Sequence, residues 1–171
     1  MASAESARPD IFLPGGQPRR ECLTETASQV LCEAVRLARE TNWESVRSPH
    51  LFMGLLAVPD AGVRLWGDRL GADLAKLLSQ FQELFQQDAG DCAPHLALNR
   101  EFLSDNVMRL VREAYVRAVM HHRSTVTPMD MLITMFTTTN SIVAECFERI
   151  GVTAAKLTEL AVFAEQQTTQ S

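Results

Sequence analysis

Apolar residues recur every three to four positions over most of the chain, a spacing typical of amphipathic α-helices. The clearest example begins after Thr24, whose hydroxyl suits a helix N-cap, and continues to Glu40. Its charged residues lie off the apolar stripe, so one face of this helix is predicted to pack against the rest of the protein. The stripe consists of Ala27, Val30, Leu31, Ala34, Leu37 and Ala38.

Three more helices are predicted before residue 86. The second is short, with Ser48 as its cap and Pro49 at its first position. It is apolar on nearly every side, so we expect it to be the most buried element. Asp60 caps the third helix, which ends at Gly71, where a left-handed residue is expected. The fourth has an apolar side made of Leu74, Leu77, Leu78, Phe81, Leu84 and Phe85.

The whole pattern occurs twice, because residues 23–85 fall on residues 103–165 without a gap when they are moved forward by 80 positions. Identical residues recur on apolar faces and at helix ends, where a shared backbone requires them. The helix starts and stops of the second copy are predicted at Ser104, Thr127-Pro128, Asn140 or Ser141, Gly151 and Thr153. We therefore predict an all-α protein in which a pseudo-twofold duplicated four-helix motif forms a compact eight-helix bundle.

The segments outside the two copies differ from them in composition. The first 22 residues contain three prolines and two glycines. We therefore expect a flexible leader, in which only Ile11, Phe12 and Leu13 are apolar enough to dock. The predicted layout is a leader over 1–22, a first copy over 23–85, a connector over 86–101, a second copy over 102–165 and a polar, fraying tail over 166–171.

Composition narrows the class of protein. With 46% apolar and 22% charged residues among 171, the chain has the balance of a soluble globular domain. Its net charge of −5 argues against a nucleic-acid binder, which needs a basic face. No apolar run approaches the ~20 residues of a membrane span, and the start of the chain lacks the design of a secretory signal. Four scattered cysteines without a C-x-x-C pair suit free thiols, so we predict a cytoplasmic location.

The duplicated order of helices and their punctuation resembles the N-terminal (Clp repeat) domain of Clp-type AAA+ unfoldases. The resemblance covers Leu23 to Glu165. The residues that carry it in the first copy are Leu23-Thr24, Ala34, Ala38, Val46, His50-Leu51, Leu55-Leu56 and Leu70-Gly71.

This resemblance implies a domain that catalyses nothing itself. In the family it sits on a flexible tether above an ATP-driven ring and receives adaptor proteins, substrate segments or exposed apolar peptide. The chain has no G-x-x-x-x-G-K-[ST] phosphate loop, so it is not expected to hydrolyse ATP by that route. It is then either a free-standing relative of the domain or part of a longer protein.

His50 opens the second helix, and Asp130 holds the equivalent position 80 residues later. The two side chains could pair across the pseudo-twofold axis as the polar groups of a binding groove. Alternatively, each could form hydrogen bonds with backbone groups at the start of its own helix. Met129, Met131 and Met135 are expected to add a soft surface for varied side chains. The predicted peptide- or adaptor-binding residues are Thr24, Trp43, His50, Tyr115, Met129 and Asp130.

The first copy contains two tryptophans that the second copy lacks. Trp43 and Trp66 end its first and third helices, and the second copy has Arg123 and Cys146 there. Trp66 is expected in the core, whereas Trp43 is the better candidate for an exposed anchor.

One departure from the family bears on its ligands. Many members carry an acidic residue just before the histidine of the second helix, and in some this residue helps to bind phosphorylated arginine. This chain has Pro49 and Met129 at the two positions, and neither can pair with a guanidinium group. Phosphoarginine recognition is therefore not expected.

Two other functions compete with this interpretation. A small helical metal-binding protein or enzyme could use Cys92, His95, His121 and His122, but no second pair of ligands completes a zinc site, and we expect no metal or cofactor. A stand-alone regulator could instead compete for Clp adaptors. The expected partners are an adaptor, an unfolded substrate segment or a Clp ATPase or protease component, bound by a monomeric chain with no role for nucleic acid or membrane.

Overall fold

The computed structural model describes residues 10–88 and 96–169, and over these ranges the protein is all-helical, as predicted. The described residues form eight α-helices and two short 3-10 turns, with isolated bridges but no strand. The helices are α1 (Glu25–Glu40), α2 (Ser48–Ala57), α3 (Ala61–Leu70), α4 (Leu74–Leu84), α5 (Asp105–Met120), α6 (Pro128–Thr137), α7 (Ile142–Glu148) and α8 (Ala154–Thr169), and the 3-10 turns are η2 (Arg20–Cys22) and η3 (Arg100–Phe102).

The duplication is present in the backbone. Helices α1 and α5 start and end 80 residues apart, as do α2 and α6, and also η2 and η3. The left-handed residues repeat with the same offset: Asn42 and His122 have φ of 64° and 62°, and Gly71 and Gly151 have φ of 78° and 89°. The two copies therefore share one chain path.

The copies also exchange equivalent contacts. Leu23 forms a parallel bridge with Val126, and Val46 forms one with Leu103. In the same pairings the Thr24 N–H donates to the Val126 carbonyl at 3.0 Å, and the Ser104 N–H donates to the Val46 carbonyl at 2.9 Å. Reciprocal contacts of this kind are what a twofold relation requires, so the pseudo-twofold prediction is confirmed.

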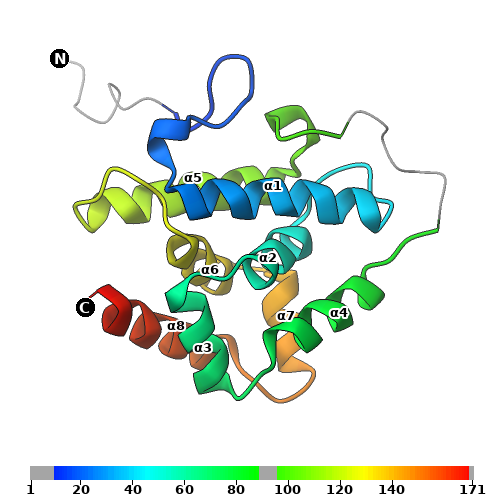
Figure 1. The fold of residues 1–171 in the computed structure, drawn as a ribbon, viewed down its shortest axis with the longest axis vertical. Helices are drawn as coiled ribbons and strands as arrows, with labels where there is room; N and C mark the ends of the chain where they lie inside the picture. The colour runs from blue at the N-terminus through cyan, green and yellow to red at the C-terminus, as the bar shows by residue number, and fades with distance from the viewer. Residues whose placement is uncertain (1–9, 89–95, 170–171) are drawn as a thin grey trace.

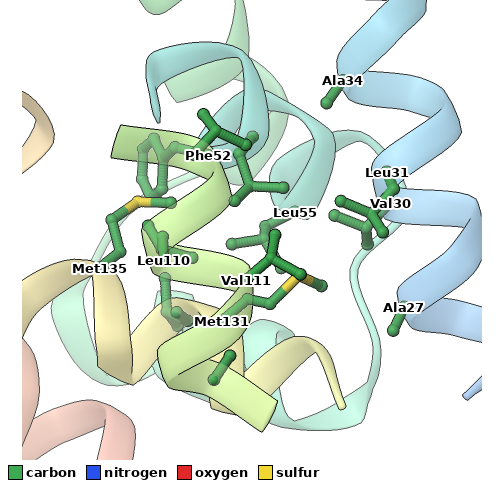
Figure 2. Close-up of a cluster of buried hydrophobic side chains, with 14 of the residues drawn as sticks. Ala27, Val30, Leu31, Ala34, Phe52, Leu55, Leu110, Val111, Met131 and Met135 are labelled. Atoms are coloured by element: carbon green, nitrogen blue, oxygen red, sulfur yellow. The ribbon is translucent and has the colours of Figure 1, made fainter. Parts of the chain in front are cut away.

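The centre of the bundle consists of α2 and α6. Figure 1 shows α1 and α5 on one side of this pair and the other four helices on the opposite side. Apolar side chains from α1, α2, α5 and α6 meet between them (Figure 2). Near the lower helices, the rings of Phe52, Trp66, Phe136 and Phe147 lie with centroids 5.7–6.3 Å apart. Residues Pro49–Leu56 of α2 and Pro128–Phe136 of α6 are buried, so α2 shares with α6 the position of most buried element that was predicted for it.

Residues 10–22 of the predicted leader lie against the bundle, and they make the apolar contact that the sequence allows for. The Leu13 N–H donates to the Gln17 carbonyl at 2.7 Å and forms a tight loop. Ile11 and Phe12 are buried, and Asp10 pairs with Arg112 of α5 at 2.9 Å. The apolar pair and the ion pair together fix the segment. Residues 1–9 lie outside the described residues.

Two element boundaries also need correction. Arg47, not Ser48, is the N-cap of α2, so Pro49 stands at the second helical position. The reason is that the His50 ring accepts the Arg47 N–H, which begins the helix one residue earlier. At the other end of the chain, α8 continues to Thr169 and takes in most of the segment predicted to fray.

No helix in the described ranges combines the length and the apolar character that a bilayer crossing requires.

Candidate functional site

The six residues predicted to bind a partner do not form one surface. His50 and Asp130 have no exposed surface, and Met129 is 3% exposed. Thr24 caps α1, and its side chain accepts the Ala27 N–H. It remains partly exposed, as do Trp43 and Tyr115, so these three stay candidates for contact with a partner.

His50 is built into the start of α2. Its Nδ1 accepts the Arg47 N–H at 2.9 Å, so the proton is on Nε2, which lies 3.2 Å from the Thr41 hydroxyl. Trp43 covers the imidazole edge-on at 5.3 Å, and its indole N–H donates to the Phe85 carbonyl at 2.5 Å. Burial, reinforced by the nearby charge of Arg47, lowers the pKa of His50 to about 4. Trp43 is therefore half-buried over a neutral histidine, and only its exposed part remains a candidate for contact with a partner.

Asp130 lies at the centre of an ionic cluster. Its carboxylate accepts the Thr127 N–H at 2.9 Å and hydrogen bonds from Arg117 at 2.6 Å and from Arg123 at 2.5 and 2.7 Å. Arg117 also binds Glu165 of α8 through both terminal nitrogens, at 2.8 and 2.9 Å. Burial alone would raise the pKa of Asp130, but these hydrogen bonds outweigh it and hold the pKa below its ordinary value.

The two clusters occupy equivalent places in the two copies. An offset of 80 relates Leu37, Trp43, His50 and Phe85 to Arg117, Arg123, Asp130 and Glu165. The same region is thus apolar in the first copy and ionic in the second. His50 and Asp130 are each bonded within their own copy, which corresponds to the alternative in which each satisfies groups at its own helix start.

The methionines of α6 face the core. Met131 and Met135 have no exposed surface, and the side chain of Met129 packs against Gly62 of α3. The expectation of a soft methionine surface is therefore wrong, because α6 is covered on all sides as a central helix.

The residues considered for a metal site are not gathered together in the part of the chain that the structure describes. No three His, Cys, Asp or Glu side chains there are grouped to hold a metal ion. His121 and His122 are exposed at the end of α5, where His122 supplies the left-handed residue that ends the helix. Cys92 and His95 lie outside the described residues.

An apolar groove between α4 and α7 was not predicted from the sequence. It has a volume of about 310 Å³, and it is bordered by the turns after α3 and α7, which are equivalent in the two copies. Ile150 stands on its rim and is 72% exposed. The residues that line the groove are Leu70, Gly71, Ala72, Asp73, Lys76, Leu77, Gln80, Phe147, Ile150 and Val152.

The groove lies where the two halves of the pseudo-twofold pair pack differently. Helix α3 packs along α8, whereas the equivalent helices α7 and α4 approach each other less closely and meet through the rings of Phe147 and Phe81, whose centroids are 6.2 Å apart. Only Phe81 of α4 is buried, although the helix carries six large apolar residues at or near it. A larger hollow of about 590 Å³ on the other side of α4 is lined by polar residues such as Glu40, Gln82 and Gln86, and it offers little to an apolar ligand.

The comparisons with known proteins agree with this architecture. Residues 22–103 match the family model described as the Clp repeat (R) N-terminal domain. No curated protein sequence matches the chain.

Solved structures resemble the chain over most of its length. The N-terminal domain of the chaperone ClpD from Arabidopsis thaliana is 18% identical, with a TM-score of 0.64, and the match covers 85% of this chain and 96% of that one. The N-terminal domain of Hsp104 from Candida albicans is 12% identical, with a TM-score of 0.63 and coverages of 83% and 90%. The N-domain of ClpV from Vibrio cholerae is 15% identical, with a TM-score of 0.61 and coverages of 84%. At these identities the likeness establishes a shared fold.

Proposed function

We propose that this chain, which has the fold of the Clp N-terminal domains, is a docking domain that binds segments of other polypeptides and performs no chemistry of its own. The bound segment belongs to an adaptor, an unfolded substrate or a Clp component. This is the role that the resemblance implies, and the features of the surface are consistent with it.

The observation that carries the proposal is the groove between α4 and α7. It joins an apolar floor to an isoleucine that is 72% exposed on its rim, and a peptide side chain that enters the groove would bury both. Its mixture of apolar floor and polar edge, the latter from Asp73 and Lys76, suits a peptide whose backbone stays hydrated while its side chains enter.

The polar groups of the described residues support a structural and not a catalytic role. Every buried side-chain nitrogen or oxygen there has a hydrogen-bond partner within the protein. The two titratable groups with the most enclosed positions, His50 and Asp130, are committed to their own helix starts. Neither one faces the groove.

The direct test is binding of a permanently unfolded polypeptide. Reduced and alkylated α-lactalbumin is titrated into the ¹⁵N-labelled chain, with intact folded α-lactalbumin as the control. We expect micromolar binding of the unfolded form, with amide shifts concentrated at Leu77, Ile150 and Val152. Absence of heat in calorimetry together with unchanged amide shifts would remove the proposal.

A further inference from the structure

The two copies supply a template for the ligand of the groove. In one half of the molecule, α3 and the central helix α6 both pack along α8. The Trp66 indole N–H donates to the Leu157 carbonyl of α8 at 3.2 Å, and the Arg69 guanidinium lies 4.5 Å from the centre of the Phe163 ring. Trp66 and Arg69 are three residues apart, so they share one face of α3.

The equivalent face of α4 is covered only in part. Leu157 and Ala164 of α8 are fully buried, whereas their counterparts on α4, Leu77 and Leu84, are exposed in part, Leu84 to 59%. In α7 the position of Trp66 is taken by Cys146, and α7 reaches α4 through Phe147, whose ring centroid lies 6.2 Å from that of the buried Phe81. On either side of Phe81, at Leu77 and Leu84, the apolar stripe of α4 is open to another helix.

One exchange at the edge of this face also sets a charge preference. Phe163, which meets Arg69 on α8, corresponds to Glu83 on α4, and Glu83 is exposed at the border of the polar hollow on the other side of α4. A basic residue of a helix bound along α4 would meet the Glu83 carboxylate at the position where Arg69 meets the Phe163 ring. The pairing of a cation with a carboxylate is at least as favourable as its contact with an aromatic face.

We propose that the α4–α7 groove binds an amphipathic helical segment of another polypeptide that carries an aromatic residue and, three positions later, a basic residue. The aromatic side chain enters the groove beside Leu77 and Phe147, under the rim formed by Ile150. The basic residue pairs with Glu83 one to two turns further along α4. This inference rests on the proposed docking function and names the kind of segment that docks.

The experiment uses a fluorescein-labelled, alanine-rich helical peptide with Trp and, three positions later, Arg on one face, titrated with the full chain and followed by anisotropy. We expect saturable binding that falls at least tenfold when the Trp of the peptide is replaced by Ala. Replacing Arg by Glu in the peptide should weaken binding several-fold, and the chain variant Glu83→Lys should restore much of that loss through the reversed pair.

The matched chain variants are Ile150→Asp in the groove and Met120→Asp on α5, which place the same charge at residues that are 72% and 74% exposed. Neither exchange is expected to disturb the core. Ile150→Asp should weaken peptide binding at least tenfold, and Met120→Asp should change it less than twofold. Equal effects of the two variants, or no binding of the peptide, would overturn the inference.

The outcome also separates this inference from the docking function itself. If unfolded α-lactalbumin binds but the helical peptide does not, the chain docks polypeptides and the segment class is wrong. If α-lactalbumin binds equally well to the Ile150→Asp variant, docking takes place elsewhere on the surface. If neither ligand binds, both proposals fall.

Discussion

His50 and Asp130 close the first turn of equivalent helices in the same way with different chemistry. His50 Nδ1 accepts the Arg47 N–H at 2.9 Å, and Asp130 Oδ2 accepts the Thr127 N–H at 2.9 Å. The position requires only a lone pair directed at the preceding loop, which a neutral imidazole and a carboxylate both supply. The two copies therefore keep one backbone geometry while their responses to pH differ.

The histidine should make stability depend on pH between about 6.5 and 4. The pKa of His50 falls from 6.5 to about 4 on folding, so the unfolded chain binds more protons in this interval. Its contribution is fully present above pH 6.5 and is lost as the pH falls toward 4, with a total of about 3 kcal/mol. Urea denaturation at a series of pH values measures the free energy of unfolding that shows this loss.

The variant His50→Asn isolates the effect. Asn keeps an oxygen that can accept the Arg47 N–H but does not titrate, so its stability should vary less between pH 6.5 and 4 than that of the natural chain. Parallel pH profiles for the two proteins would show that His50 is not the group responsible.

Removing one member of the ionic cluster of the second copy should lower the free energy of unfolding strongly, whereas replacing the whole cluster should lower it little. Asp130→Ala leaves Arg117 and Arg123 without their central carboxylate, and the expected loss is about 3–5 kcal/mol of unfolding free energy in guanidinium denaturation. Replacing all four members by their first-copy counterparts should recover most of this loss. The combined substitutions are Arg117→Leu, Arg123→Trp, Asp130→His and Glu165→Phe. A quadruple variant no more stable than Asp130→Ala would show that the two copies are not interchangeable here.

The helices could be predicted from the sequence because periodicity and punctuation repeat with one offset. Gly71 and Gly151 are both left-handed, and Thr24 and Ser104 both act as caps, as the pattern indicates. The apolar character of Ile11 and Phe12 indicated that this part of the leader could dock, and both are buried. The ion pair of Asp10 with Arg112 could not be predicted, because the two residues are remote in sequence and local composition carries no information on such a contact.

The candidate sites were harder to predict for a related reason. The exchange of Trp66 for Cys146 is visible in the sequence, but its consequence depends on which helices face each other across the axis. In the same way, the four members of the ionic cluster span 48 positions between Arg117 and Glu165, and only the fold brings them together. Among the predicted binding residues, His50 and Asp130 are buried caps at helix starts, a role that the sequence alone does not distinguish from an exposed polar group.

Replacing His122, the left-handed residue after α5, by glycine should stabilise the protein. His122 has φ of 62°, a conformation that costs a residue with a Cβ roughly 1–2 kcal/mol relative to glycine. His122→Gly should raise the free energy of unfolding by about 1 kcal/mol after the entropic cost of glycine. The first copy supplies the control, because the short polar side chain of Asn42 suits the same conformation and donates to the Gln87 carbonyl at 3.0 Å, so Asn42→Gly should gain less. A destabilised His122→Gly variant would mean that the imidazole makes contacts that outweigh the strain.

Helices α1 and α2 lie so close together at Gly54 that no side chain should fit at this position. A Cβ at this position would lie 2.6 Å from the Val30 carbonyl oxygen and 3.3 Å from the Ala34 nitrogen, both of which are backbone atoms of α1. Because backbone cannot turn aside as a side chain can, Gly54→Ala must push the two helices apart. The expected net loss is about 2 kcal/mol in chemical denaturation, even though alanine favours the helix. The equivalent residue of α6 is Thr134, so the second copy has space for a side chain at this position and the first does not.

The matched control is Gly62→Ala, which gains the same helix propensity but meets mainly the flexible side chain of Met129. It should lower the free energy of unfolding by less than about 1 kcal/mol. If Gly54→Ala were the more stable of the two variants, α1 and α2 would have to pack less closely than they do here.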